Sequence, residues 1–593
     1  MRLWITSVIA LGAAATAFAQ TPTITAVQDA ASYTSNIARG SVFVVKGSNL
    51  SSSGFVQASD PSVTPWSTTL NGVSITLTPV AGGSAVNAYM IYTYNQGGVN
   101  QLAALLPSST KEGDYNVTVT TGSGTSAPFK TTVLTHKFGL ITIDSSGSGG
   151  VVAQNVVTQT QYDVNRFTTG TLGQYTMSPA HPGEVLILWG TGLGPINGPD
   201  NVPPGAVDLR NSVAVQVIVG GVTVTPDYYA GRAPTLPGAD QINFTLPSNV
   251  QTGCTVPLQV SVAGQLSNAT TISIAPLGQN ACSSPQFSQS VLSKLDQGGS
   301  LVVGNFTLSQ IATSMSVPGV GNVNAKIESA DGAFSKFSGA QLATVGVLFN
   351  PTGACQVFRR TGSQTAIITG LPSANLDAGP ISLNGPGIAN KALTKDSSNL
   401  YSLSIDTVIS GLGLPPGFTL PGFSTTPVIT QGTYQLAGSG GADVGAFNAS
   451  VGVGTPLTIT SNGGQLPASV NRGSDLTLTW TGGNSNDLVS IIGASGTNVG
   501  SQQNPVFDSG VFICTTTAGR GTLTVPSSIL QQLPVTPANA GTTINGEGIL
   551  MVESSTQPVQ GNGLFTAPLT AGGNIDQGVF VATFGNLSTT SYQ

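Results

Sequence analysis

The sequence has little charge. Only 7% of its 593 residues are Asp, Glu, Lys or Arg. Helices of soluble proteins normally expose Lys and Glu, whereas half-buried strands favour Val, Ile, Thr and aromatics, so this composition argues against a helical protein. With a formal net charge of −6 and 18 basic residues, the chain also lacks the basic surface that binds phosphate backbones. We therefore expect neither nucleic acid nor an anionic membrane surface as a partner.

Residues for hydrolytic catalysis are also scarce. His136 and His181 are the two histidines, and no G-x-S-x-G nucleophile motif is present. Most carboxylates stand beside Gly, Pro or Asn, as in Asp331-Gly332, where turn formation explains them better than a pair of catalytic acids does. The sequence therefore predicts that the protein is not an enzyme. An active site within 283–593 is the less favoured alternative.

No dedicated metal motif is found. Loop carboxylates and carbonyls suit calcium, but the sequence has no D-x-D-x-D-G loop. Asp377 and Asp443 are the two calcium candidates, and turn formation is the simpler interpretation of both. No cofactor is expected beyond this possible calcium ion.

One apolar run stands at the start of the chain. Arg2 precedes apolar residues 3–16, and Ala17-Phe18-Ala19 forms a small-x-small cleavage site. This pattern predicts a signal peptide over 1–19, cut before Gln20. No later run is long enough to span a bilayer, so we expect no membrane span after cleavage. The expected location is the cell surface or the medium, with the periplasm as an alternative.

Four cysteines follow, and none belongs to a C-x-x-C pair that would indicate zinc: Cys254, Cys282, Cys355 and Cys514. An even number in an exported chain predicts two disulfides, although the sequence does not fix their pairing. We favour Cys254 with Cys282, because they bracket the last two strands of one predicted domain. Cys355 then pairs with Cys514. Free buried thiols are the alternative.

Glycine is abundant, with 76 residues. Many segments also alternate apolar and polar residues, as strands do. Residues 40–50 and 183–193 share a glycine turn, an apolar strand centre and a polar turn, and residues 100–107 match 240–247. Each copy ends in a strand pair with a Gly-containing turn, which is typical of an immunoglobulin-like β-sandwich. We expect one sandwich over 20–135 and a second over 179–276, with 136–178 as a bridging segment. Val42 and Val44 should face the same way as Val185 and Ile187.

Several segments of these copies resemble a known family: 138–149, 182–185, 189–195, 220–222, 229–231 and 240–243. They are similar to the Solibacter-type uncharacterised domain family of secreted acidobacterial proteins. The resemblance covers 22–276 and implies modules of the immunoglobulin-like IPT/TIG group, without an established activity. In the first copy, residues 48–51 replace the glycine-rich turn at 192–195.

The remainder also reads as β-structure. A short helix is expected over 287–296, and a Pro-Gly stretch at 415–422 separates a β-rich domain (277–431) from a C-terminal β-sandwich (432–593). Leu476, Leu478 and Trp480 alternate as in a strand, and Thr522 begins another, which a short helix from Ser527 follows. The predicted fold class is all-β, with tandem immunoglobulin-like sandwiches followed by β-rich C-terminal domains.

Aromatic residues are the remaining candidates for recognition, because rings stack on sugars and dominate protein interfaces. Tyr92 and Tyr94 share one face of a predicted strand, and Tyr229 occupies the matching place in the second copy. Core packing is the simpler interpretation of all three. The favoured function is non-catalytic adhesion or surface and matrix assembly outside the cell. Carbohydrate binding associated with polysaccharide use is the alternative, so the expected partner is an extracellular protein or a polysaccharide.

Overall fold

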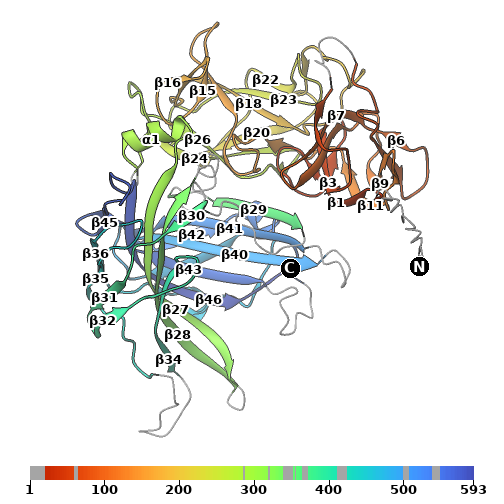
Figure 1. Cartoon of the computed structure of the whole chain (residues 1–593). Helices are drawn as coiled ribbons and strands as arrows, with labels where there is room; N and C mark the ends of the chain where they lie inside the picture. Colours follow the sequence, from red (N-terminus) through yellow and green to blue (C-terminus); the bar gives the residue numbers. More distant parts are fainter. Residues whose placement is uncertain are drawn as a thin grey trace, which may run out of the picture.

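The all-β fold is confirmed. The structure, a computed structural model, describes residues 20–58, 65–284, 287–317, 321–337, 352–353, 355–362, 372–410, 424–498, 507–536 and 548–593. Figure 1 shows the first two sandwiches beside each other and the C-terminal half, coloured green to blue, below them. The predicted signal peptide and the Pro-Gly break at 415–422 lie outside the described residues. Within the described residues, no helix is long and apolar enough to cross a membrane.

The first sandwich has two sheets. The first sheet has the order β1 (Thr23–Asp29), β3 (Val42–Ser48), β8 (Val99–Leu105), β7 (Tyr89–Gln96) and β4 (Gly54–Gln57). The second has the order β2 (Ile37–Ala38), β11 (Phe129–Leu134), β9 (Gly113–Thr121), β5 (Ser74–Pro79) and β6 (Val86–Asn87), with β10 (Gly124–Thr125) beside β9. Alternate residues such as Phe43, Leu102 and Val117 fill the space between the sheets, as the period of two requires.

The second sandwich is larger than the sequence predicted. One sheet has the order β16 (Gly170–Leu172), β17 (Tyr175–Ser178), β15 (Tyr162–Asn165), β14 (Ala153–Val156), β18 (Val185–Thr191), β23 (Asp240–Thr245), β22 (Tyr229–Arg232) and β19 (Val207–Asp208), and β12 (Gly139–Leu140) pairs with β18. The other has the order β13 (Gly149–Gly150), β26 (Thr270–Ile274), β24 (Gly253–Val262), β20 (Val215–Val219) and β21 (Val222–Val224), with β25 (Gln265–Leu266) beside β24. Residues 136–178 are therefore not a bridge. They supply strands to the sandwich, because β14 pairs along the whole of its length with β18.

The two sandwiches repeat one another as predicted. Strand β18 takes the place of β3, and β23 takes the place of β8. The core contains Phe43 and Val45 in the first copy and Leu186 and Leu188 in the second. The four residues that the sequence matched all point away from the space between the sheets and belong to neither core cluster, although Val44 and Ile187 are buried: Val42, Val44, Val185 and Ile187.

Buried polar contacts join the two sandwiches. The Thr191 hydroxyl accepts a hydrogen bond from the Val42 amide at 2.9 Å and donates one to the Gly238 carbonyl at 2.7 Å. The Asp200 carboxylate accepts from both the amide and the hydroxyl of Ser108, each at 2.6 Å. Since these groups satisfy one another in the interface, the two sandwiches are held in one orientation.

The C-terminal half is built on one long sheet. Its order is β29 (Cys355–Gly362), β41 (Phe507–Thr517), β40 (Leu488–Asn498), β43 (Ile549–Ser555), β46 (Gln577–Thr589), β27 (Leu301–Val317), β28 (Gly321–Phe337), β34 (Tyr401–Ser410) and β33 (Thr394–Lys395), with β30 (Ala374–Leu376), β44 (Val559–Gln560) and β45 (Gly563–Phe565) alongside. Smaller sheets cover it: β32 (Ile388–Ala392), β31 (Ile381–Gly385), β35 (Gly432–Gly438) and β36 (Phe447–Val453); β37 (Thr458–Ile459), β39 (Leu476–Thr481) and β42 (Thr522–Val525); and the pair β38 (Ser469–Val470) and β47 (Ser591–Tyr592).

The predicted domain boundary at 431/432 is wrong. Strand β35 begins at Gly432, yet it pairs with β31. One core cluster contains Phe306, Tyr434 and Phe580 together. Strand β27 also pairs in parallel with β46, so residues from both predicted domains form a single sheet. The division failed because pairing between strands so distant in sequence leaves no local signal.

Both predicted helices are present. Helix α1 (Gln289–Asp296) begins after Ser288, whose hydroxyl accepts a hydrogen bond from the Val291 amide, as an N-cap does. Helix α3 (Ser527–Leu530) follows Pro526. Two 3₁₀ turns, η2 (Ser461–Gly464) and η3 (Ala518–Arg520), complete the described helical elements.

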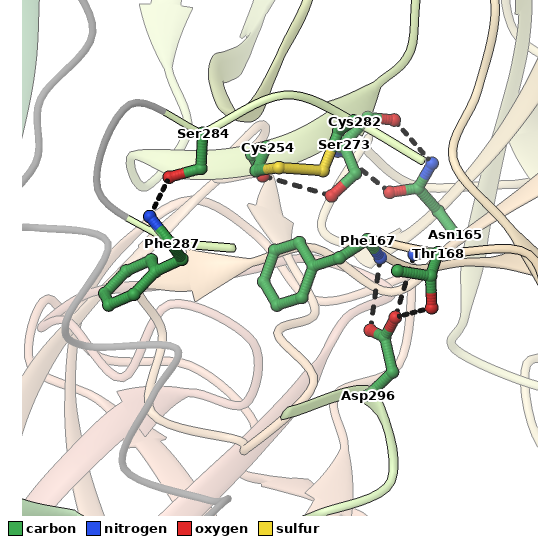
Figure 2. The surroundings of a disulfide bond; sticks show 9 residues. All are labelled: Asn165, Phe167, Thr168, Cys254, Ser273, Cys282, Ser284, Phe287 and Asp296. Carbon is green, nitrogen blue, oxygen red and sulfur yellow. Dashed lines mark hydrogen bonds between the residues drawn. A yellow bond between two sulfur atoms is a disulfide. The ribbon is translucent and has the colours of Figure 1, made fainter. Parts of the chain in front are cut away.

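A disulfide fastens the chain where it leaves the second sandwich (Figure 2). Cys254 and Cys282 are bonded, with their Cα atoms 5.0 Å apart, which confirms the favoured pairing. Nearby, the Asp296 carboxylate accepts hydrogen bonds from the amides of Phe167 and Thr168 and from the Thr168 hydroxyl. These contacts tie α1 to the second sandwich. The second predicted disulfide, between Cys355 and Cys514, joins β29 to β41.

Candidate functional site

A β-bulge in β7 turns two tyrosines out of the core of the first sandwich. Met90 is fully buried and pairs with Ala104, so strict alternation would also place Tyr92 in the core. The register shifts between Met90 and Tyr92, and Tyr92 pairs instead with Ala103. Tyr92 and Tyr94 consequently lie on the outer surface of the sheet, and their burial is intermediate. They are not core residues.

Neighbouring strands complete this surface. Tyr94 lies between Phe55 on β4 and Gln101 on β8, and Gln101 is in turn paired with Lys46 on β3. We call Lys46, Phe55, Tyr92, Tyr94 and Gln101 the tyrosine face. Phe55 is 51% exposed, and its ring centroid lies 5.9 Å from that of Tyr92 and 6.1 Å from that of Tyr94. Three aromatic rings therefore form one cluster that solvent reaches.

The polar groups of this face are fixed. The Gln101 side-chain amide donates a hydrogen bond to the Tyr92 hydroxyl. The Lys46 ammonium lies 4.8 Å from the ring centroid of Tyr33, a cation–π distance. Burial raises the pKa of the Tyr33 hydroxyl to about 12, and burial also raises the pKa of the Tyr92 hydroxyl. Both phenols stay protonated at neutral pH, so they are available as hydrogen-bond donors.

Tyr33 also has an unusual backbone. Its φ is 54°, in the left-handed region that bulky residues rarely adopt. Its amide donates to the Asp29 carbonyl at 3.0 Å, and the Asp29 amide donates to the Thr34 carbonyl at 3.0 Å, so a tight turn holds the conformation. Such strain is concentrated at binding and catalytic sites.

The structure places the third tyrosine candidate elsewhere. Tyr229 lies on β22 of the second sandwich, and so does not join Tyr92 and Tyr94. Its hydroxyl accepts from the Val207 amide at 3.0 Å and donates to the Arg232 carbonyl at 2.5 Å. It pairs with Asn243 as Tyr92 pairs with Ala103, so the two tyrosines occupy equivalent positions of the repeat.

The two calcium candidates lie side by side. The Asp443 carboxylate accepts from the Asp377 amide at 2.8 Å, and the Asp377 carboxylate accepts from the Gly379 amide at 2.8 Å and from the Lys395 ammonium at 2.6 Å. The Lys395 ammonium holds the pKa of Asp377 below its usual range. These hydrogen bonds support the turn interpretation, because they occupy oxygens that calcium would need. Calcium binding there stays a prediction.

The two histidines contact loops. His136 Nδ1 lies 2.6 Å from the Leu193 carbonyl. His181 lies between the Glu184 carboxylate, 3.0 Å from Nδ1, and the Gln279 carbonyl, 2.9 Å from Nε2, at the wall of an open hollow of about 440 Å³. Among the described residues, no three His, Cys, Asp or Glu side chains gather as a metal site.

The sequence did not identify Phe55 or Tyr33 as site residues. Phe55 follows a run of serines and has no alternating neighbours to mark a strand, and Tyr33 stands in a turn. What could have indicated Phe55 is one apolar pair, Phe55-Val56, between polar residues. Such a pair is uninformative until β4 is placed beside β7.

Comparison with known proteins assigns no family. No family model matches the chain, and no curated protein matches it. Among solved structures, it is similar at 13% identity to the Bacteroides ovatus mixed-linkage glucan utilization locus protein SGBP-B in complex with a mixed-linkage heptasaccharide. That alignment has a TM-score of 0.18 and covers 41% of this chain and 47% of that one, so it spans less than half of that protein.

Two further structures show weak similarity. SGBP-B from a complex xyloglucan utilization locus in Bacteroides uniformis is 12% identical over 65% of this chain and 86% of that chain, with a TM-score of 0.15. The fibronectin(III)-like modules of Clostridium thermocellum CbhA are 10% identical over 42% of this chain and 95% of that chain, with a TM-score of 0.10. Scores this low carry no argument about function.

Proposed function

We propose that this chain is a non-catalytic extracellular protein that binds polysaccharide on the tyrosine face of its first sandwich. The observation that carries the proposal is the β-bulge, which turns Tyr92 and Tyr94 out of the core to meet Phe55. An aromatic cluster on a sheet surface contributes nothing to its own core. It offers apolar planes to the C–H faces of pyranose rings.

Polar groups beside the rings supply the rest of a glycan site. Gln101 and the Tyr92 hydroxyl are already bonded to each other, so they are oriented before a sugar arrives. Groups held in place lose little conformational freedom on binding. The strained turn at Tyr33 borders the same face, through Lys46. A fixed surface of this kind is suited to ligands rich in hydroxyl groups.

The ring geometry favours a single polysaccharide chain. The Phe55 ring makes interplanar angles of 54° with Tyr92 and 63° with Tyr94. A flat crystalline surface would touch only one of these rings at a time. A free chain can rotate about its glycosidic bonds and present a different sugar face to each ring.

Extracellular adhesion, surface or matrix assembly, the function that the sequence favoured over carbohydrate binding, is compatible with this proposal. The tandem sandwiches and their fixed interface support it, because a protein that holds polysaccharide at a defined spacing would assemble a matrix. A protein partner for the tyrosine face is the competing possibility, and the experiment below distinguishes it.

The test is affinity electrophoresis of the full-length protein. Native gels would contain hydroxyethylcellulose, glucomannan or laminarin, and the variant would be Phe55→Ala/Tyr94→Ala. We expect at least one polysaccharide to retard the wild-type protein and the variant to lose about tenfold in affinity, the equivalent of about 1.4 kcal/mol. Leu400→Ala is the matched control, since it removes a side chain that is 46% exposed outside the tyrosine face.

Two results would overturn the proposal. One is unchanged mobility of the wild-type protein in every gel, which would favour a protein partner. The other is equal retardation of the wild-type protein and the double variant, which would place the glycan elsewhere on the chain.

A further inference from the structure

The second sandwich has an outer surface at the position equivalent to the tyrosine face. Gln241 on β23 pairs with Trp189 on β18, as Gln101 on β8 pairs with Lys46 on β3. The repeat therefore places an indole where the first copy has an ammonium group.

Side-chain amides surround this indole. Trp189 Nε1 donates to the Gln154 side-chain oxygen at 3.2 Å, and the Gln241 side-chain amide donates to Asn243 Oδ1 at 2.9 Å. Trp189, Gln154, Gln241 and Asn243 all have intermediate burial, so solvent reaches each of them. We call these four residues the amide face. Amides that bond one another along a sheet keep spare donors and acceptors for hydroxyl groups.

Two tyrosines extend the amide face across the sheet. Strands β15 and β17 pair in parallel, with Val164 beside Met177, so Tyr162 and Tyr175, each two residues earlier, lie on the same face of the sheet as this pair. Tyr162 is 44% exposed and Tyr175 is 57% exposed. Val164 pairs with Gln154 of β14, and Gln154 pairs with Ile187 of β18. Because Ile187 and Trp189 share one face of β18, both tyrosines lie on the surface that carries Trp189. Figure 1 shows β15, β18 and β23 on the side of the sandwich away from the C-terminal half.

Charged side chains border this surface on the side of β22 and β19: the Thr245 hydroxyl donates to the Asp227 carboxylate at 2.6 Å, and Asp208, in register with Gly231, pairs with Arg210. Strand register assigns to it these residues of the five central strands: Tyr175, Met177, Tyr162, Val164, Gln154, Val156, Val185, Ile187, Trp189, Gln241, Asn243 and Thr245. None of them is Asp, Glu, Lys or Arg. The part of the surface around Trp189, Tyr162 and Tyr175 therefore offers rings and hydrogen-bonding groups, which are what a neutral glycan needs.

We infer that the amide face, extended by Tyr162 and Tyr175, is a second binding site, specific for neutral glycan chains. The inference rests on the proposed function for its ligand class, but none of its residues belongs to the tyrosine face. The protein then holds two glycan segments at once. Because buried contacts fix the orientation of the two sandwiches, binding at one site raises the effective concentration of the same polymer at the other.

Calorimetric titration of the full-length protein would count the sites. The probes are cellohexaose and laminarihexaose, which are short and neutral. The variants are Phe55→Ala/Tyr94→Ala for the first site, and Trp189→Ala and Tyr162→Ala/Tyr175→Ala for the second. Leu400→Ala is again the control. Circular dichroism shows whether each variant is folded. If Trp189→Ala fails to fold, the Tyr162→Ala/Tyr175→Ala variant tests the second site instead, because both of its side chains are exposed.

We expect two hexasaccharides per wild-type chain and one per chain in either class of variant. On the intact polysaccharide, loss of one site should weaken binding by more than tenfold, because the avidity is lost. A stoichiometry of one that only Phe55→Ala/Tyr94→Ala abolishes would overturn the second site and leave the proposed function in place. A stoichiometry of one that only the second-site variants abolish would support the amide face and overturn the proposed role of the tyrosine face. No binding of either sugar would overturn both.

Discussion

Arg232 and Asp240 form an ion pair that is almost wholly excluded from water. Their side chains are 1% and 0% exposed, and Arg232 Nη1 lies 2.6 Å from the Asp240 carboxylate. The guanidinium also donates to the Gly194 carbonyl at 2.8 Å. Gly40 of the first sandwich approaches so closely that a Cβ there would stand 2.7 Å from Arg232 Nη2. The pair thus belongs to the contact between the two sandwiches.

Replacing the cation should be costly. Arg232→Met leaves the Asp240 carboxylate buried without a partner charge, and we expect a loss of about 3–5 kcal/mol in the free energy of unfolding at pH 8. Chemical denaturation would measure it. Arg210→Met is the matched control, because Arg210 pairs with Asp208 at 31% and 34% exposure, and exposed pairs contribute about 1 kcal/mol or less. Equal losses in the two variants would contradict the assigned role.

The same pair predicts a pH dependence. Burial raises the pKa of Asp240 from 3.8 to about 6, so the folded protein binds this proton more tightly than the unfolded chain does. The stabilisation from this group is complete below pH 3.8 and is lost as the pH rises through about 6. Since a protonated Asp240 needs no cation, the destabilisation by Arg232→Met should be smaller at pH 5 than at pH 8. Thermal unfolding across this range would show it, and a constant difference would be the contrary result.

At the scale of the element, local pattern predicted most of what the structure contains. Strand β42 begins at Thr522 and helix α1 ends at Asp296, both as expected, because turn residues and caps mark these ends. The bulge in β7 was not predictable, since nothing in the sequence around Ile91 distinguishes one inserted residue from plain alternation. Without the bulge, Tyr92 and Tyr94 read as core. The sequence therefore named Tyr92 and Tyr94 as candidates but could not show that both lie on the outer surface.

The disulfide at α1 should govern one local element. Cys254→Ser/Cys282→Ser opens a loop of 28 residues, which in the chain-entropy model costs about 3–4 kcal/mol. We expect the backbone amides of α1 to exchange faster with deuterated water in this variant, because the hydrogen bonds of Asp296 and the packing of Leu292 near Phe167 must then hold the helix without the covalent link. Cys355→Ser/Cys514→Ser is the control and should release β29 instead. Unchanged exchange in α1 would show that its packing suffices without the disulfide.

Across the whole molecule, sequence reasoning found the first sandwich and misplaced the limits of the other parts. The repeat located the first two sandwiches because two matched segments recur at nearly the same separation, 143 residues for 40 and 183 and 140 residues for 100 and 240. The C-terminal half has no such repeat, and its sheet joins Val303 to Gln577. Gly379 and Gly440 are a second case of distant segments that meet. A Cβ at Gly379 would stand 2.1 Å from the Gly440 carbonyl oxygen, so the two backbones are in contact. Each glycine-rich segment reads as an isolated turn until the fold brings the two together.

This architecture predicts which fragments fold. Residues 20–284 contain both sandwiches and the Cys254–Cys282 disulfide, so this fragment should retain a cooperative thermal transition. A fragment of 301–576 lacks β46, which lies between β43 and β27, and should expose two unpaired edges and aggregate. Dynamic light scattering and circular dichroism would separate the two outcomes. A soluble, cooperatively folded 301–576 fragment would contradict this account of the sheet.

The position of β46 near the end of the sequence also determines when the long sheet can be completed during synthesis. Its partner β27 emerges from the ribosome roughly 270 residues earlier. At about 5–20 residues per second, that is a wait of roughly 15–50 s with an open strand edge. All strands of the two sandwiches precede β27 in the chain, so neither sandwich waits for a distant strand. Until β46 is added, the strand edges of β27 and β43 stay unpaired, so we expect the C-terminal half to bind a holding chaperone for longer than the two sandwiches do.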